Sequence, residues 1–220
     1  NMNTDKAVKL IRGKAGTKVN LKFFREKTGE TFEKDITRAR IDIPTIETET
    51  KGDVFIIKLY NFYAPSPVLF RNALKDFIDS GKYKLVLDLR GNPGGYLEAS
   101  VDIASWFLPL GKIIVREDFG NNSDEVIYRS KGYDIFNENL KMVILVNEGS
   151  ASASEILAGA LKEQGKAKLI GTRTFGKGSV QEVVDLSGGS SLKVTIARWL
   201  TPLGNSISEN GLKPDYEVQI

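Results

Sequence analysis

The sequence predicts an α/β fold from about residue 54 onward, with a mostly parallel sheet flanked by helices. Short apolar strands alternate there with segments of helical periodicity, and repeated strand–helix units are typical of parallel sheets. Two glycine-rich turns follow buried strands, one after Leu89 and one after Val146. Ligand sites in such sheets lie beyond the carboxyl ends of the strands, so we expect both turns at the functional edge.

Apolar periodicity and caps predict the elements of this region. Ser66 is placed to cap a helix with Pro67 at its first position, and Gly81 lies near its end. The predicted strands are Val54–Tyr60, Leu85–Leu89, Met142–Val146 and Leu169–Ile170, and the apolar helical faces lie within 70–78, 97–108 and 156–161. Two longer alternating strands, Val180–Leu186 and Leu192–Trp199, predict a closing antiparallel pair.

Residues 1–43 predict a separate small unit. A helix over Thr4–Arg12, capped by Thr4, precedes two strands over Lys18–Phe24 and Phe32–Ile41. One helix and a hairpin bury too little surface to form a core, so we expect these residues to be the end of a larger domain. The polar stretch from Pro44 to Asp53 is predicted to be a linker, and residues 44–220 are predicted to form the second domain.

Composition limits the chemistry that is available. The 220 residues contain neither histidine nor cysteine, which excludes a Ser-His-Asp triad, a thiolate nucleophile and a histidine-rich metal site. A neutral lysine is then the strongest base that could activate a hydroxyl. We expect no metal and no cofactor. Basic and acidic residues are mixed and the net charge is only +3, which argues against nucleic-acid binding. No apolar run approaches the roughly 20 residues of a membrane span.

The turn over Gly149–Glu155 offers three serines between a buried strand and a helix, close to free backbone amides. The turn over Gly91–Gly95 offers further N–H donors, because glycine permits positive φ. Lys177, within Thr174–Gly178, is the lysine in a conspicuous context, and as a base it needs an apolar, crowded surrounding. Each turn taken alone is also an ordinary corner of a parallel sheet, and a serine at a helix start is often only a cap.

Three motifs in this order resemble the carboxyl-terminal processing peptidases of serine peptidase family S41. They are Asp88–Gly95 (DLRGNPGG), Asn147–Ile156 (NEGSASASEI) and Gly171–Gln181 (GTRTFGKGSVQ), and the closing segments Ala197–Pro202 and Asn210–Asp215 also resemble that family. The resemblance covers roughly residues 54–217. It implies a ClpP/crotonase-like core and a serine endopeptidase that cleaves proteins or peptides near apolar carboxyl-terminal tails. It also implies an extracytoplasmic location, in the periplasm or cell envelope, and is compatible with a homo-oligomer.

The resemblance also assigns roles to residues. Ser152, the middle serine of Ser150–Ser154, is the implied nucleophile, and Lys177, 25 positions later, is the implied base. Gln181 is implied to orient the lysine amine. The backbone amides of Gly95 and Ala153 are the implied oxyanion hole.

Some members of the family carry an aspartate eleven residues after the serine. Glu163 stands at that position here, and we expect it to be a solvated helix residue.

Residues 5–19 resemble the last helix and the following strand of a PDZ domain, so the resemblance implies that residues 1–43 are the carboxyl-terminal part of such a domain. The half of a PDZ domain that holds a terminal carboxylate has no counterpart in this sequence. Two other functions share the core fold. A crotonase-like acyl-CoA enzyme would not explain the serine and the lysine together. A non-catalytic binding or scaffolding relative would have no physical reason to keep a buried lysine facing a serine.

Overall fold

The computed structural model describes residues 3–40, 44–120, 123–208 and 210–218. The chain divides into two compact units, Asn1–Ile43 and Pro44–Ile220. Within the described ranges, no helix is both long and apolar enough to cross a membrane.

The first unit is a helix followed by a hairpin: α1 (Thr4–Ile11), β1 (Lys18–Arg25) and β2 (Glu30–Thr37). The cap predicted at Thr4 is wrong. The helix begins at Thr4 itself, and the side chain of Asn3 accepts a hydrogen bond from Lys6 N at 2.9 Å. The second strand ends at Thr37, and the predicted end at Ile41 lies outside the described residues. No side chain whose burial is described in this unit is buried, in keeping with the expectation that it forms no core alone.

The second unit is built on a six-stranded sheet in the order β12-β9-β8-β5-β4-β3. All neighbours pair in parallel except β3 and β4, which are antiparallel. The strands are β3 (Ile46–Lys51), β4 (Val54–Leu59), β5 (Lys84–Asp88), β8 (Lys141–Val146), β9 (Lys168–Gly171) and β12 (Tyr216–Glu217). The helices are α2 (Ser66–Asp79), α3 (Leu97–Ser105) and α4 (Ala153–Glu163). The predicted α/β fold with a mostly parallel, helix-flanked sheet is therefore confirmed.

The stretch predicted to be a linker contains strand β3. It pairs along its whole length with β4, from Ile46 opposite Leu59 to Lys51 opposite Val54. The sequence Ile-Glu-Thr-Glu-Thr-Lys is polar because β3 is the last strand of the sheet, and edge strands commonly carry charged side chains. Composition alone therefore suggested a loop where the backbone forms a strand.

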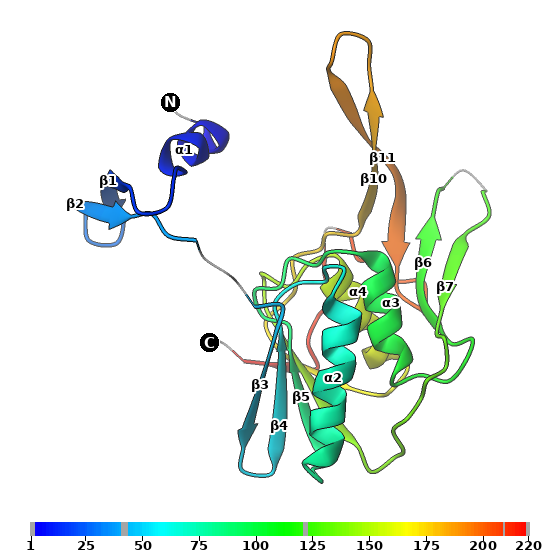
Figure 1. Cartoon of the computed structure of the whole chain (residues 1–220). Coiled ribbons are helices and arrows are strands. Elements are labelled where there is room, and N and C mark those ends of the chain that lie inside the picture. The colour runs from blue at the N-terminus through cyan, green and yellow to red at the C-terminus, as the bar shows by residue number, and fades with distance from the viewer. Residues whose placement is uncertain (1–2, 41–43, 121–122, 209, 219–220) are drawn as a thin grey trace. The chain divides into compact units, whose positions relative to one another are not determined.

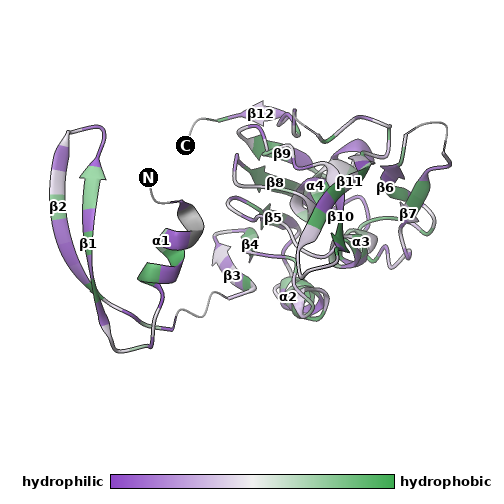
Figure 2. Cartoon of the chain, turned by 90° about the horizontal axis from the view of Figure 1, so that it is seen from above, coloured by the Kyte–Doolittle hydropathy of each residue, from purple (hydrophilic) through white to green (hydrophobic). Residues whose placement is uncertain are grey.

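The core lies under one face of this sheet. Along β4, β5 and β8 the buried side chains alternate with partly exposed ones, as the period of a strand requires. Ile57, Leu87 and Ile144 are each 0% exposed on that face. Figure 2 shows α2, α3 and α4 on the same side of the sheet. Buried apolar side chains of these helices belong to the same core as those of the strands.

A second, antiparallel sheet has the order β10-β11-β6-β7. Its strands are β6 (Ile113–Asp118), β7 (Val126–Arg129), β10 (Ser179–Asp185) and β11 (Ser191–Leu200). The predicted closing pair is confirmed, and β10 and β11 form a long ribbon in Figure 1. Strands β6 and β7 were not predicted, although the run Ile113–Val115 is rich in β-branched residues, which favour strands.

We expect Ile144→Ala to lower the free energy of unfolding by about 2–5 kcal/mol, because it removes fully buried methyl groups and leaves a cavity at the centre of the sheet. Urea denaturation followed by circular dichroism measures the change. Val68→Ala on α2 is the control, since Val68 is 53% exposed and should cost less than about 1 kcal/mol. Equal losses in the two variants would contradict the assignment of the core.

Candidate active site

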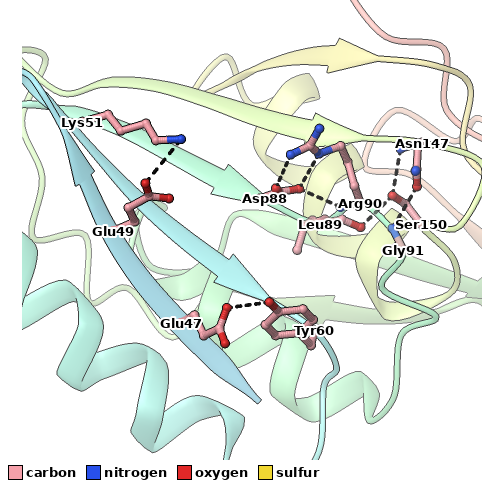
Figure 3. A network of polar contacts seen from close by, with 10 residues as sticks. All are labelled: Glu47, Glu49, Lys51, Tyr60, Asp88, Leu89, Arg90, Gly91, Asn147 and Ser150. Carbon is pink, nitrogen blue, oxygen red and sulfur yellow. Dashed lines mark hydrogen bonds and ion pairs between the residues drawn. The ribbon is translucent and has the colours of Figure 1, made fainter. Parts of the chain in front are cut away.

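The two glycine-rich turns lie side by side at the carboxyl edge of the parallel sheet, as predicted. They follow β5 and β8, which are neighbours in the sheet. Ser150 Oγ donates to Leu89 O at 2.8 Å, and Asn147 Oδ1 accepts from Gly91 N at 2.9 Å. Figure 3 shows this pair of contacts between the turns. The two segments, about sixty residues apart in sequence, therefore form one rigid platform.

Gly94 lies directly against the serine turn. Its φ is +97°, which favours glycine, and a Cβ built there would lie 2.6 Å from Ala151 O and 2.8 Å from Ser152 Cβ. No side chain fits in that space. The position of Ser152 therefore requires a glycine at residue 94.

The structure distinguishes the three serines physically. Ser150 and Ser154 are both 0% exposed, and their hydroxyls donate to carbonyls of the neighbouring turn, at Leu89 O and at Asn92 O. Ser152 is partly exposed, at the amino end of α4. The outer two serines therefore fasten the turns together, and the middle one faces the accessible side.

Ser152 adopts an unusual backbone conformation, with φ +56° and ψ −116°. Positive φ is uncommon for a residue with a Cβ, and such conformations cost about 1–3 kcal/mol and cluster at functional sites. The hydrogen bonds made by the residues on either side hold it there. Ala151 N donates to Asn92 O at 3.0 Å, and Ser154 N donates to Ala151 O at 3.1 Å.

Two backbone N–H groups beside Ser152 have no acceptor. Within the described part of the chain, neither Gly95 N nor Ala153 N donates a hydrogen bond, although Ala153 is only 1% exposed. Phe62 N donates to Gly94 O and Tyr96 N donates to Phe62 O, so the residues on both sides of Gly95 are paired with Phe62 while the Gly95 N–H is not. Gly95 is exposed, whereas an unpaired N–H at a residue as buried as Ala153 is rare in folded proteins.

Glu155 is the group that joins the serine turn to the lysine turn. It is 0% exposed, and its carboxylate accepts four hydrogen bonds. Oε2 accepts from Ser152 N and Lys177 N, both at 2.9 Å. Oε1 accepts from Thr174 Oγ1 at 2.6 Å and from Gly176 N at 2.7 Å. No role was predicted for Glu155, whose only local signal is that a glutamate stands three residues after a helix-capping serine.

Lys177 and Gln181 are both exposed. No hydrogen bond joins the Lys177 amine to Ser152 or to Gln181 in the described ranges. The expectation that Lys177 lies in an apolar, crowded surrounding is therefore wrong for this structure. The lysine turn is held through its backbone, by Gly176 N and Lys177 N, and the Lys177 side chain itself is exposed.

Glu163 is not the solvated helix residue that was expected. Its carboxylate accepts from Thr201 Oγ1 at 2.7 Å, from Leu203 N at 2.8 Å and from Asn205 Nδ2 at 2.9 Å. It therefore anchors the turn after β11.

Asp88 and Arg90 form a two-pronged ion pair next to the platform, and this too was not predicted. Arg90 Nε and Nη2 lie 2.9 and 2.6 Å from the two Asp88 oxygens (Figure 3). The bond to the nearly buried Asp88 raises the pKa of the Arg90 guanidinium. The pair lines a cavity of about 620 Å³ with Lys58, Gly91, Asn147, Glu148 and Thr172. Nowhere in the described ranges do three acidic side chains gather as metal ligands.

Comparison with known proteins supports the reading of the three motifs. Residues 53–218 match peptidase family S41. The chain belongs to peptidase family S41. The carboxy-terminal processing protease CtpA of Bacillus subtilis (strain 168) is 37% identical over 220 residues, which are 100% of this chain and 46% of that protein. A probable CtpA-like serine protease of Staphylococcus aureus (strain COL) is 39% identical over 214 residues, 97% of this chain and 42% of that protein.

The chain therefore spans less than half the length of these S41 relatives. Among solved structures, the photosystem II D1 C-terminal processing protease is similar, with a TM-score of 0.81 and 32% identity. That likeness covers 94% of this chain and 57% of the other. The family predicted from the motifs is thus confirmed.

We expect Glu155→Gln to lower the free energy of unfolding by about 2 kcal/mol or more, because an amide NH₂ would face two of the four donors and leave them unpaired. Urea denaturation tests stability, and hydrolysis of a fluorogenic peptide tests activity, which should fall as well. Glu163→Gln removes the same charge from the same helix and should cost stability without loss of activity. Activity retained in Glu155→Gln would show that the link between the turns is dispensable.

A methyl group at Gly94 should displace the serine turn, since the added Cβ would lie 2.8 Å from Ser152 Cβ. Gly94→Ala is therefore expected to abolish labelling of Ser152 by a fluorophosphonate. Gly91→Ala is the matched control on the same turn, because its φ is also positive, at +68°, but nothing lies within 4 Å of its Cβ. It should cost about 1–2 kcal/mol of stability and still be labelled. Equal labelling of both variants would contradict the steric argument.

Proposed function

We propose that this S41 chain is the catalytic core of a serine endopeptidase, with Ser152 as nucleophile and Lys177 as general base, that cleaves protein substrates near their carboxyl termini. The observation that carries the proposal is the serine turn itself. Of its three serines, only Ser152 is free of a hydroxyl bond to the neighbouring turn and reaches the surface, and it stands beside two unpaired N–H groups.

In the proposed reaction, Ser152 Oγ attacks the carbonyl carbon of the scissile peptide bond and its proton passes to the neutral Lys177 amine. The negative charge that develops on the carbonyl oxygen is stabilised by the N–H groups of Gly95 and Ala153. The lysine then gives the proton to the leaving amine, and an acyl-enzyme ester forms on Ser152. Water, deprotonated by the same lysine, hydrolyses this ester and regenerates the serine.

The exposed position of Lys177 sets a condition on this mechanism. Glu155 fixes the backbone of Lys177 relative to Ser152, so in this proposal it is the lysine side chain that moves toward the hydroxyl. Catalytic hydrogen bonds often form only when substrate is bound. A substrate that covers the turn would remove water from the amine and favour its neutral form. In this proposal the side-chain amide of Gln181, which lies on β10 four residues after Lys177, orients the Lys177 amine.

Substrate binding by strand addition fits the position of β10. This strand begins two residues after Lys177 and lies at the edge of its sheet, so its outer backbone groups are available to an extended peptide. Such binding uses the backbone of the substrate more than its side chains. Apolar carboxyl-terminal tails, an extracytoplasmic location, a homo-oligomer and the PDZ origin of residues 1–43 remain predictions from the family resemblance.

A non-catalytic binding module is the second candidate. The exposed Lys177 favours it, since a module without catalysis has no need to hold the amine against the serine. Reaction with a fluorophosphonate separates the two functions, because it requires an activated serine and no knowledge of the substrate. Covalent labelling at Ser152, located by peptide mapping, is expected. An unlabelled Ser152 in the folded protein would favour the binding module.

We expect Ser152→Ala and Lys177→Ala each to lower kcat for peptide hydrolysis by roughly 10⁴-fold or more, and the double variant to be no worse than either, because the two groups act as a unit. Lys177→Arg should be equally inactive, since a guanidinium stays protonated and cannot accept the hydroxyl proton.

Lys193→Arg on β11 is the control for the added guanidinium, and hydrolysis of one fluorogenic peptide by all variants is the measurement. Substantial hydrolysis by Lys177→Arg would exclude this lysine as the base.

A further inference from the structure

An arginine lies on the open face of the β10–β11 ribbon, at its base. Along β11, Ala197 and Trp199 are 4% and 9% exposed and belong to the buried side, whereas Arg198 between them is exposed. Successive side chains of a strand point to opposite faces. Arg198 therefore lies on the face away from the core, opposite Ser179 of β10 and Asp118 of β6.

A polar cavity of about 450 Å³ opens at this face, next to the lysine turn. Gly176 forms one wall, and Arg198 forms another. The other lining residues in the described part of the chain are neutral and carry hydroxyl or amide groups: Ser179, Thr195, Ser206, Ser208 and Asn210. The register of β10 and β11 shifts between Val180 and Gln181, which interrupts the alternation of side chains. Thr195 and Arg198 of β11 therefore line the same cavity. Such a β-bulge often changes the direction of side chains beside an active site.

Among the described residues Arg198 forms no ion pair, although Asp118 lies opposite it in the register of β11 and β6. Within the described ranges its guanidinium makes no hydrogen bond and no ion pair, and no described acidic residue lines the cavity. Asp118 accepts a hydrogen bond from Gly120 N and lines a neighbouring cavity with Arg198, but it does not line this one.

The other arginines near this site differ. Arg173 donates to Asn210 O at 2.7 Å, and Arg116 pairs with Glu125 at 2.9 Å. A lone cation among neutral donors is an arrangement that favours an anionic ligand.

The chemistry of the lining selects a carboxylate. A guanidinium binds a carboxylate through two parallel N–H bonds, and serine and threonine hydroxyls supply further donors. We propose that Arg198 is a specificity-determining residue that binds a carboxylate of the peptide substrate in this cavity, beside Lys177. The inference rests on the proposed function and identifies a substrate group that the core itself recognises. The carboxylate is either the terminal one or an acidic side chain near the scissile bond.

Peptide binding to the Ser152→Ala protein tests this without catalysis. The first pair of probes is a short fluorescein-labelled peptide ending in Ala-Leu-Ala, prepared with a free carboxyl terminus and with an amidated one. The second pair is amidated in both members and carries either Glu or Gln near its carboxyl end. Fluorescence anisotropy gives Kd for all four. We expect at least about tenfold tighter binding of the carboxylate form in one pair, equivalent to about 1.4 kcal/mol. The pair in which the carboxylate form binds more tightly shows whether the cavity binds the terminal carboxylate or an acidic side chain.

Arg198→Gln should abolish that preference and Arg198→Lys should keep part of it, because lysine retains the charge but not the two-pronged geometry. Lys193→Gln, which removes one positive charge from the same strand outside the cavity, should leave the preference unchanged. Circular dichroism checks that each variant is folded. If Arg198→Gln does not fold, Arg198→Lys still tests the role of the two-pronged guanidinium, because the preference should then be reduced. Absence of a preference in both pairs, or an unchanged preference in the folded Arg198→Gln protein, would overturn the proposal.

The same peptides, given to the protein with Ser152 intact, separate this proposal from the proposed function. If no peptide is cleaved but the carboxylate preference in binding depends on Arg198, the cavity assignment holds and the protease function fails. If peptides are cleaved and the kcat/KM ratio of the two forms is the same with and without Arg198, the protease function holds and the cavity assignment fails.

Discussion

The arrangement of the site depends on one buried carboxylate. Glu155 accepts hydrogen bonds from the backbone of both Ser152 and Lys177, and it is 0% exposed. A buried charge is tolerated only where its lone pairs are satisfied, and here four donors do so. The same bonds that stabilise the charge set the separation of the two turns. Through Thr174, whose hydroxyl also accepts from Leu212 N, the network reaches the closing segment of the chain.

The two halves of the candidate dyad are held differently. The serine turn is fixed on all sides, by Ser150 and Ser154 to the neighbouring turn and by Gly94 packed against it. The lysine turn is fixed only through its backbone, and the Lys177 side chain is exposed. The candidate nucleophile is thus held in place before any substrate binds, whereas the position of the candidate base depends on what covers it.

The sequence was sufficient for the fold class and for the edge of the sheet at which the site lies, because apolar period and glycine-rich turns are local signals. It was insufficient for β3, whose edge position makes it polar, and for the exposure of Lys177, which depends on neighbours distant in sequence. Glu155 shows the same limit. Its partners Thr174 and Gly176 lie about twenty residues away, and no local pattern marks a glutamate as the acceptor for a second turn.

The backbone of Ser152 has an evolutionary consequence. At φ +56° a glycine would relieve the conformational cost, and selection for stability alone would favour that replacement. A relative in which this serine had no function would be free to replace it by glycine. A serine in this conformation is a continuing cost in stability, and a cost of this kind persists only while something other than stability selects for it.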